Sequence, residues 1–127
     1  MGAWDIRTLQ NDEALDAMWQ ISKKPATLDT IRKALSDESI DVKLIGIAMV
    51  VTAIEKDIDM EVFGSLYDYE QFFKQFTTLE INNQILQDAQ DALAYVRKHD
   101  YNWFGESKQE RIDFLDRLSK ILYSYEN

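Results

Sequence analysis

The chain has 127 residues, the size of one ordinary domain, and 46% of them are hydrophobic, which suffices for a buried core. It has no cysteine, so disulfides, thiolate metal sites and cysteine nucleophiles are excluded. Its 23 acidic and 14 basic residues give a formal net charge of −9, which disfavours binding to nucleic-acid phosphates and favours a basic partner. We expect a single helical domain over residues 1–127.

The first residues and the apolar runs bear on where the protein resides. The chain opens without the basic start and apolar run of a secretory signal. Its longest nearly unbroken apolar run, residues 44–54, is far shorter than the roughly 20 residues needed to cross a bilayer. We therefore expect a soluble, cytoplasmic protein with no membrane partner.

A first helix is expected to begin at Asn11, a good N-cap residue, and to be stopped by Pro25. Leu15, Met18 and Trp19 recur at helical spacing and form its predicted apolar face. A short second helix is expected after Thr27, which can cap it, with a buried stripe formed by Leu28, Ile31 and Leu35.

A third helix is predicted from Ile40 to Ile54, opened by Ser39 or Asp41. It is apolar nearly all round, as expected of a central helix, and small residues such as Gly46 would let neighbouring helices approach closely. The segment is rich in β-branched residues, so a buried strand is the alternative. Its length and the lack of an internal turn signal favour a helix.

The rest of the chain predicts a less regular region over residues 60–78, a fifth helix over 81–98 and a sixth that begins with the capping box Ser107-x-x-Glu110. The fifth helix has one apolar face, made of Ile85, Ala89, Ala92, Leu93 and Val96. The predicted fold is all-α, an irregular bundle of about six helices around a central apolar helix.

Enzymatic chemistry finds little support in the sequence. His99 is the single histidine, it lies near the predicted end of the fifth helix, and there is no nucleophile elbow, phosphate loop or set of zinc ligands. Asp57, Asp59 and Glu61 alternate like the start of a calcium loop, but Val62 stands where an EF-hand needs glycine. We expect no cofactor.

Two acidic pairs form an alternative metal site, Asp88-x-x-Asp91 and Glu110-x-x-Asp113, which can hold magnesium for nucleotide hydrolysis when they lie on neighbouring helices. Their spacing resembles that of the all-α nucleotide pyrophosphohydrolases, although the first pair in that family is Glu-x-x-Glu. Helical geometry places Asp91 nearly opposite the apolar face of its helix, and Asp113 well away from Leu115. A magnesium-dependent hydrolase therefore stays an alternative.

An acidic and aromatic segment over residues 57–70, without lysine or arginine, is typical of a surface that docks a basic protein. The predicted partner-binding residues are Asp57, Asp59, Glu61, Tyr67, Asp68, Tyr69 and Glu70. The following stripe of Phe72, Phe73 and Phe76, with Tyr69, has the helical spacing that usually marks a core. Whether the segment is surface or core is left open.

Both ends of the chain resemble an uncharacterised bacterial family of small proteins. Its members open Met-Gly-x-Trp-Gly and continue Asn-Asp-x-Ala-x-Asp, and the chain matches with Met1-Gly2-Ala3-Trp4 and residues 11–16. The ending around Trp103 and Ser107 is similar too, whereas Asp5 replaces the glycine after the tryptophan. Small acidic proteins of this kind are suspected of being immunity proteins for secreted bacterial toxins, and the resemblance implies such a role.

These observations predict a non-catalytic binding protein, most plausibly an immunity protein or inhibitor that blocks a basic protein such as a nuclease toxin. The alternatives are the magnesium-dependent nucleotide hydrolase and an acidic mimic of nucleic acid that occupies a DNA-binding protein.

Overall fold

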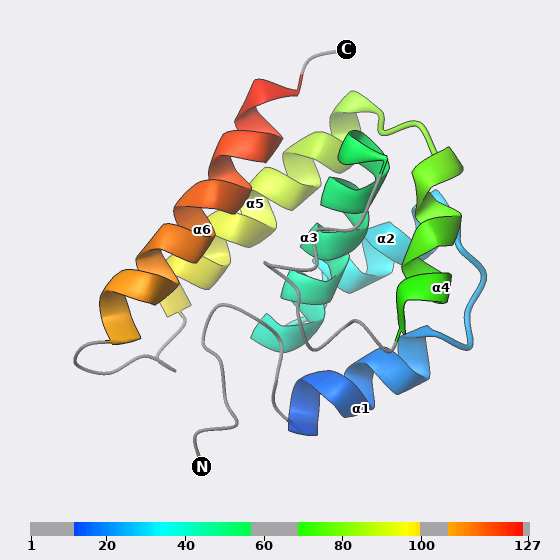
Figure 1. Cartoon of the computed structure of the whole chain (residues 1–127), viewed down its shortest axis with the longest axis horizontal. Helices are drawn as coiled ribbons and strands as arrows, with labels where there is room; N and C mark the ends of the chain where they lie inside the picture. The colour runs from blue at the N-terminus through cyan, green and yellow to red at the C-terminus, as the bar shows by residue number, and fades with distance from the viewer. Residues whose placement is uncertain (1–11, 57–68, 100–106, 126–127) are drawn as a thin grey trace.

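The computed structural model describes residues 12–56, 69–99 and 107–125. Every regular element in these ranges is a helix: α1 (Asp12–Ile21), α2 (Leu28–Leu35), α3 (Ile40–Glu55), α4 (Glu70–Lys74), the 3-10 helix η2 (Gln75–Thr78), α5 (Asn83–His99) and α6 (Ser107–Ser124). In Figure 1, α3 runs through the middle, and α5 and α6 lie side by side and antiparallel along one side of it. The predicted all-α bundle of about six helices around a central apolar helix is confirmed.

The central helix α3 is buried on all sides over residues 43–53 and contacts each of the other helices. The hydroxyl of Ser39, its N-cap, accepts a hydrogen bond from the Val42 N–H at 3.3 Å. At the other end Lys56 adopts a left-handed conformation, with φ of 61°, and its ammonium donates to the Leu79 carbonyl at 2.9 Å. The helix prediction, and not the strand alternative, is confirmed.

Helix α2 packs against α3 at very short range. Thr27 caps α2 as predicted, because its hydroxyl accepts from the Thr30 N–H at 3.3 Å. At the contact, a Cβ atom built on Gly46 would lie 3.0 Å from the backbone nitrogen of Leu35 and 3.1 Å from the Cβ of Ala34. Glycine is therefore needed there for the close approach of two backbones.

The aromatic stripe of α4 and η2 belongs to the core. Phe72, Phe73 and Phe76 are buried, and the rings of Phe72 and Phe76 meet edge to face with centroids 5.1 Å apart. This confirms the core interpretation of the stripe.

Helix α5 starts two residues later than the sequence predicts, since the side chain of Asn82 accepts from the Ile85 N–H at 2.8 Å and so acts as a cap. Its predicted apolar face is buried throughout. Arg97 ties α5 to α6 through an ion pair with Asp116 at 2.6 Å. None of the helices in the described ranges is long and apolar enough to span a membrane.

Helix α1 differs from the prediction in two ways. It ends at Ile21, four residues before Pro25. Trp19, expected on the apolar face, is 53% exposed, and the Lys23 ammonium lies 3.3 Å from the centroid of its ring. Among the side chains of this helix that the structure describes, Met18 and Ile21 are buried, and at about 100° per residue Trp19 turns away from the side that they share.

Candidate functional site

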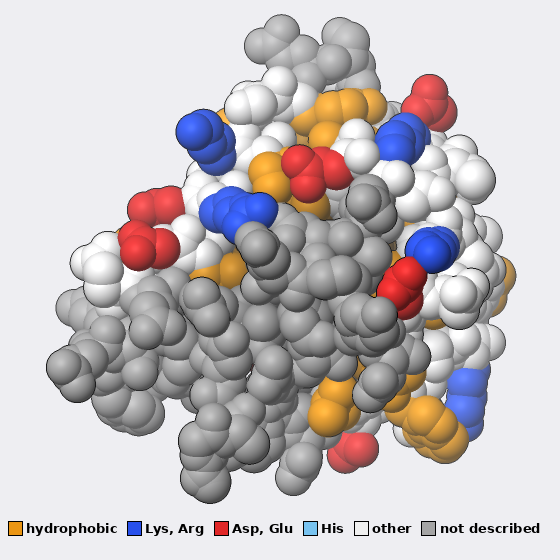
Figure 2. All heavy atoms as spheres, viewed as in Figure 1, with side chains coloured by type: hydrophobic (Ala, Val, Ile, Leu, Met, Phe, Trp, Pro, Cys, Tyr) orange, Lys and Arg blue, Asp and Glu red, His pale blue; other side chains and the backbone are white. Residues whose placement is uncertain are grey.

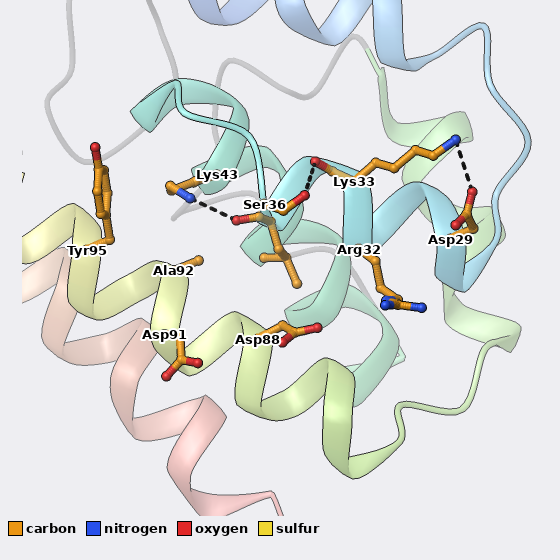
Figure 3. Close-up of a pocket in the computed structure, with 10 residues that line it drawn as sticks. Asp29, Arg32, Lys33, Ser36, Lys43, Asp88, Asp91, Ala92 and Tyr95 are labelled. Atoms are coloured by element: carbon orange, nitrogen blue, oxygen red, sulfur yellow. Dashed lines mark hydrogen bonds and ion pairs between the residues drawn. The ribbon is translucent and has the colours of Figure 1, made fainter.

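A pocket of about 610 Å³ lies between the end of α2, the start of α3 and the middle of α5. Figure 3 shows its walls: the labelled residues of α5 lie on one side, and those of α2 and α3 on the other. Its volume falls within the range of about 300–1,000 Å³ that is typical of small-molecule sites. It is lined by Asp29, Arg32, Lys33, Leu35, Ser36, Lys43, Asp88, Asp91, Ala92 and Tyr95.

The wall made by α5 is acidic. Asp88, Asp91 and Tyr95 share one face of the helix because they are spaced three and four residues apart. The side-chain amide of Gln84 donates to Asp88, and that of Gln87 to Asp91, each at 2.9 Å. Both glutamines lie one turn earlier on the same helix, so they fix the carboxylates without neutralising them.

The wall made by α2 is basic, because Arg32 and Lys33 fall in the last turn of this helix, where cations suit the dipole. The Lys33 ammonium pairs with Asp29 at 3.2 Å on the same helix, and both side chains are mostly exposed. Arg32 forms no ion pair within the described part of the chain.

Lys43 closes the pocket from the first turn of α3, and its residue is only 9% exposed. Its ammonium donates to the carbonyl of Leu35, the last residue of α2, at 3.0 Å. It also lies 4.8 Å from the centroid of the Tyr95 ring, within the range of a cation–π contact. No carboxylate of the described residues pairs with it.

Tyr95 lines the pocket and also contacts His99 at the end of α5. The ring is 40% exposed, and the imidazole of His99 lies against it with centroids 4.2 Å apart. His99 is the last residue of α5, so the predicted placement at a helix end is confirmed.

The alternative metal residues are distributed over two helices. Asp88 and Asp91 line the pocket on α5, while Asp113 lies exposed on α6 and accepts from the Gln109 amide at 3.0 Å. The side chain of Glu110 lies outside the described residues. Among the residues that are described, no group of three or more acidic or histidine side chains could hold a metal ion.

The predicted docking segment is described only at its end. Asp57, Asp59, Glu61, Tyr67 and Asp68 lie outside the described residues. Tyr69 is half-buried and packs against the core. Glu70 is 27% exposed and pairs with Lys74 at 2.8 Å.

Neither the pocket nor Lys43 is predicted from the sequence. The sequence does contain a signal, because Lys43 is the only lysine or arginine within the segment from Ile40 to Ile54, which is apolar nearly all round. A cation at a position that packing buries needs a partner, and its partners lie on α2 and α5, far away in the sequence.

Comparison with known protein families, with characterised proteins and with solved structures finds no match to the chain. The site must therefore be interpreted from its own chemistry. On the face drawn in Figure 2, acidic and basic side chains of the described residues are interspersed, so the net acidity does not gather there.

Proposed function

We propose that the protein is a non-catalytic binding protein that blocks a basic protein partner, as an immunity protein or inhibitor of a nuclease toxin does. The observation that carries this proposal is the arrangement of carboxylates on α5 and α6. Asp88, Asp91 and Asp113 each accept a hydrogen bond from a glutamine one turn earlier in the same helix. None of them pairs with a lysine or arginine of the described residues.

These glutamines make the acidic residues suitable for docking a cation. An amide donor restricts the carboxylate to one orientation but leaves its charge in place, so less side-chain freedom is lost on binding. Two large aromatic side chains on the same helices, Tyr95 and Tyr123, are 40% and 61% exposed and can supply contact area. The formal net charge of −9 would speed the encounter with a basic protein.

The segment over residues 57–70 stays part of the proposal as a second acidic surface. Its acidity and aromatic content support that role, and so does the resemblance of both ends of the chain to a family of small bacterial proteins. The two surfaces make separate predictions, so one experiment can distinguish them.

The experiment begins with capture of partners from a lysate of the source organism at low and at high salt, followed by purification of any basic protein retained at low salt. Its association rate is then measured with Asp88→Asn/Asp91→Asn/Asp113→Asn. Removing these three carboxylate charges from α5 and α6 should slow association about tenfold and weaken its salt dependence.

Two further triple variants complete the design. Asp16→Asn/Glu38→Gln/Glu55→Gln removes the same charge from exposed positions elsewhere, and should slow association much less. Asp57→Asn/Asp59→Asn/Glu61→Gln tests the second surface. If all three variants behave alike, only the net charge matters, and the proposed role of the carboxylates on α5 and α6 is wrong. If no basic protein is retained at either salt, the proposed function is wrong.

A further inference from the structure

The pocket between α2, α3 and α5 contains a buried cation whose charge is only partly compensated. The Lys43 ammonium has three N–H donors, and the Leu35 carbonyl accepts one of them at 3.0 Å. The carboxyl end of a helix carries roughly half a negative elementary charge, and α2 is a short helix. A lysine that is 9% exposed normally has a full counter-charge, and Lys43 has none among the described residues.

Arg32 adds a second cation to the same wall. It lines the pocket one turn before the Leu35 carbonyl that Lys43 binds, and it forms no ion pair with a described carboxylate. The hydroxyl of Ser36 lies on this wall as well, but it donates its one proton to the Lys33 carbonyl at 3.2 Å, so the two cations are the groups that can attract an anion. This wall therefore has the chemistry of a site for an anionic group.

The wall opposite has the reverse polarity. Asp88 and Asp91 line the α5 wall and Arg32 and Lys43 the wall opposite, and in Figure 3 Asp88 lies toward Arg32, whereas the Asp91 carboxylate points away from Lys43. No ion pair within 4.0 Å joins the two walls. Opposite charges held apart around a volume of about 610 Å³ leave room for a molecule between them.

We propose that this pocket binds a small zwitterion. Its anionic group, a carboxylate or a phosphate, is held by Lys43 and Arg32, and its ammonium group is held by Asp88 and Asp91. Ala92 and the Tyr95 ring provide the apolar surface along which the connecting carbons lie. The site goes beyond the proposed docking of a protein, and binding there involves no covalent step.

A zwitterion fits better than an ion of either sign. A simple anion would meet Asp88 and Asp91, and a simple cation would meet Lys43 and Arg32, so each would have a like charge in the same pocket. Only a molecule with both charges, separated by a few bonds, compensates both walls at once.

The test is a titration of the isotope-labelled full chain, followed by amide chemical shifts, which needs no protein partner. The probes are 4-aminobutanoate and phosphoethanolamine, which carry the two kinds of anionic group. Butanoate, ethyl phosphate and butylamine represent the separate halves. We expect a zwitterion to shift amides of residues 29–36 and 88–95 and to bind about tenfold or more tightly than either of its halves.

Variants on each wall of the pocket test which residues hold the anionic end of the ligand and which hold its ammonium end. Arg32→Gln, at an exposed position, and Lys43→Met should each weaken the binding of the zwitterion about tenfold and leave that of butylamine no weaker. Asp91→Asn should weaken the zwitterion and not the simple anions. Asp113→Asn, whose carboxylate has the same glutamine contact outside the pocket, should change nothing.

The proposal has clear contrary results. Equal binding of zwitterions and their halves, shifts outside the pocket, or binding unaffected by Arg32→Gln would each overturn it. Because Lys43 is buried, Lys43→Met is interpreted only after thermal unfolding shows a folded protein, and Arg32→Gln decides the question otherwise. If the zwitterion binds but no basic protein is captured from the lysate, only the proposed function is wrong, and the proposal for the pocket stands.

Discussion

Two adjoining parts of α3 are buried for different reasons. From Leu44 to Ala53 the helix is surrounded by apolar side chains, and its burial follows from its composition. One residue earlier, Lys43 is also buried, but a carbonyl at the end of α2 and the ring of Tyr95 surround its charge. The first part stabilises the fold by apolar packing, whereas the second holds a buried charge, and it is the second part that we propose contacts a ligand.

The largest effect is expected in the apolar part. Ile45→Ala removes a side chain that is 0% exposed and leaves a cavity in the centre of the bundle. Such truncations cost about 2–5 kcal/mol in the free energy of unfolding. Urea unfolding measures this cost, with Ile54→Ala, at a half-buried position of the same helix, as the control that should cost less. A loss below about 1 kcal/mol would mean that α3 is not the core.

The next effect concerns the contact between α2 and α3. Alanine at position 46 gains about 1 kcal/mol in helix propensity, but its Cβ would lie 3.0 Å from the Leu35 backbone nitrogen. Overpacking of this kind costs about 1–3 kcal/mol, so we expect Gly46→Ala to destabilise the protein. Because α2 must shift, the carbonyl that binds Lys43 should move too. Thermal unfolding tests the sign, and a stabilised variant would show that the two helices are not in close contact.

The sequence predicts the first of these regions much better than the second. Helical periodicity and the caps Ser39 and Thr27 identify α2 and α3, and the long run of mostly apolar residues in α3 identifies the core. The pocket joins Arg32, Lys43 and Asp91, which periodicity within one helix cannot bring together. Their proximity depends on how closely α2 approaches α3 and on how α5 packs across both.

Trp19 shows the same limitation. Its spacing relative to Leu15 and Met18 is compatible with an apolar face, so the sequence predicts burial. In the structure Trp19 is exposed and its ring contacts the Lys23 ammonium, because the side of α1 that faces α3 carries Met18 and Ile21 instead. Which part of a broad apolar face is covered depends on the neighbouring helix and not on the pattern.

A smaller effect on stability is expected from Lys43→Met. Methionine keeps most of the side-chain volume, loses the hydrogen bond to the Leu35 carbonyl and removes a buried charge. The lost charged hydrogen bond and the relieved desolvation oppose one another, so the free energy of unfolding should change by about 1 kcal/mol or less. Urea unfolding of this variant beside Ile45→Ala sharpens the comparison. A loss above about 3 kcal/mol would show that Lys43 serves the fold and not a ligand.

The smallest effect is expected for the ion pair of Lys33 and Asp29, which stands at the pocket with its side chains 71% and 69% exposed. Exposed pairs at this helical spacing contribute about 0.3–0.5 kcal/mol, because water and salt screen the attraction. A double-mutant cycle with Lys33→Ala and Asp29→Ala should give a coupling of that size that vanishes in about 1 M salt. A coupling well above 1 kcal/mol, or one that salt leaves unchanged, would mean that this pair is shielded from water. In that case Lys33, like Arg32 and Lys43, would present a poorly screened positive charge to the pocket. The α2 wall would then attract an anionic group more strongly than its exposed side chains suggest.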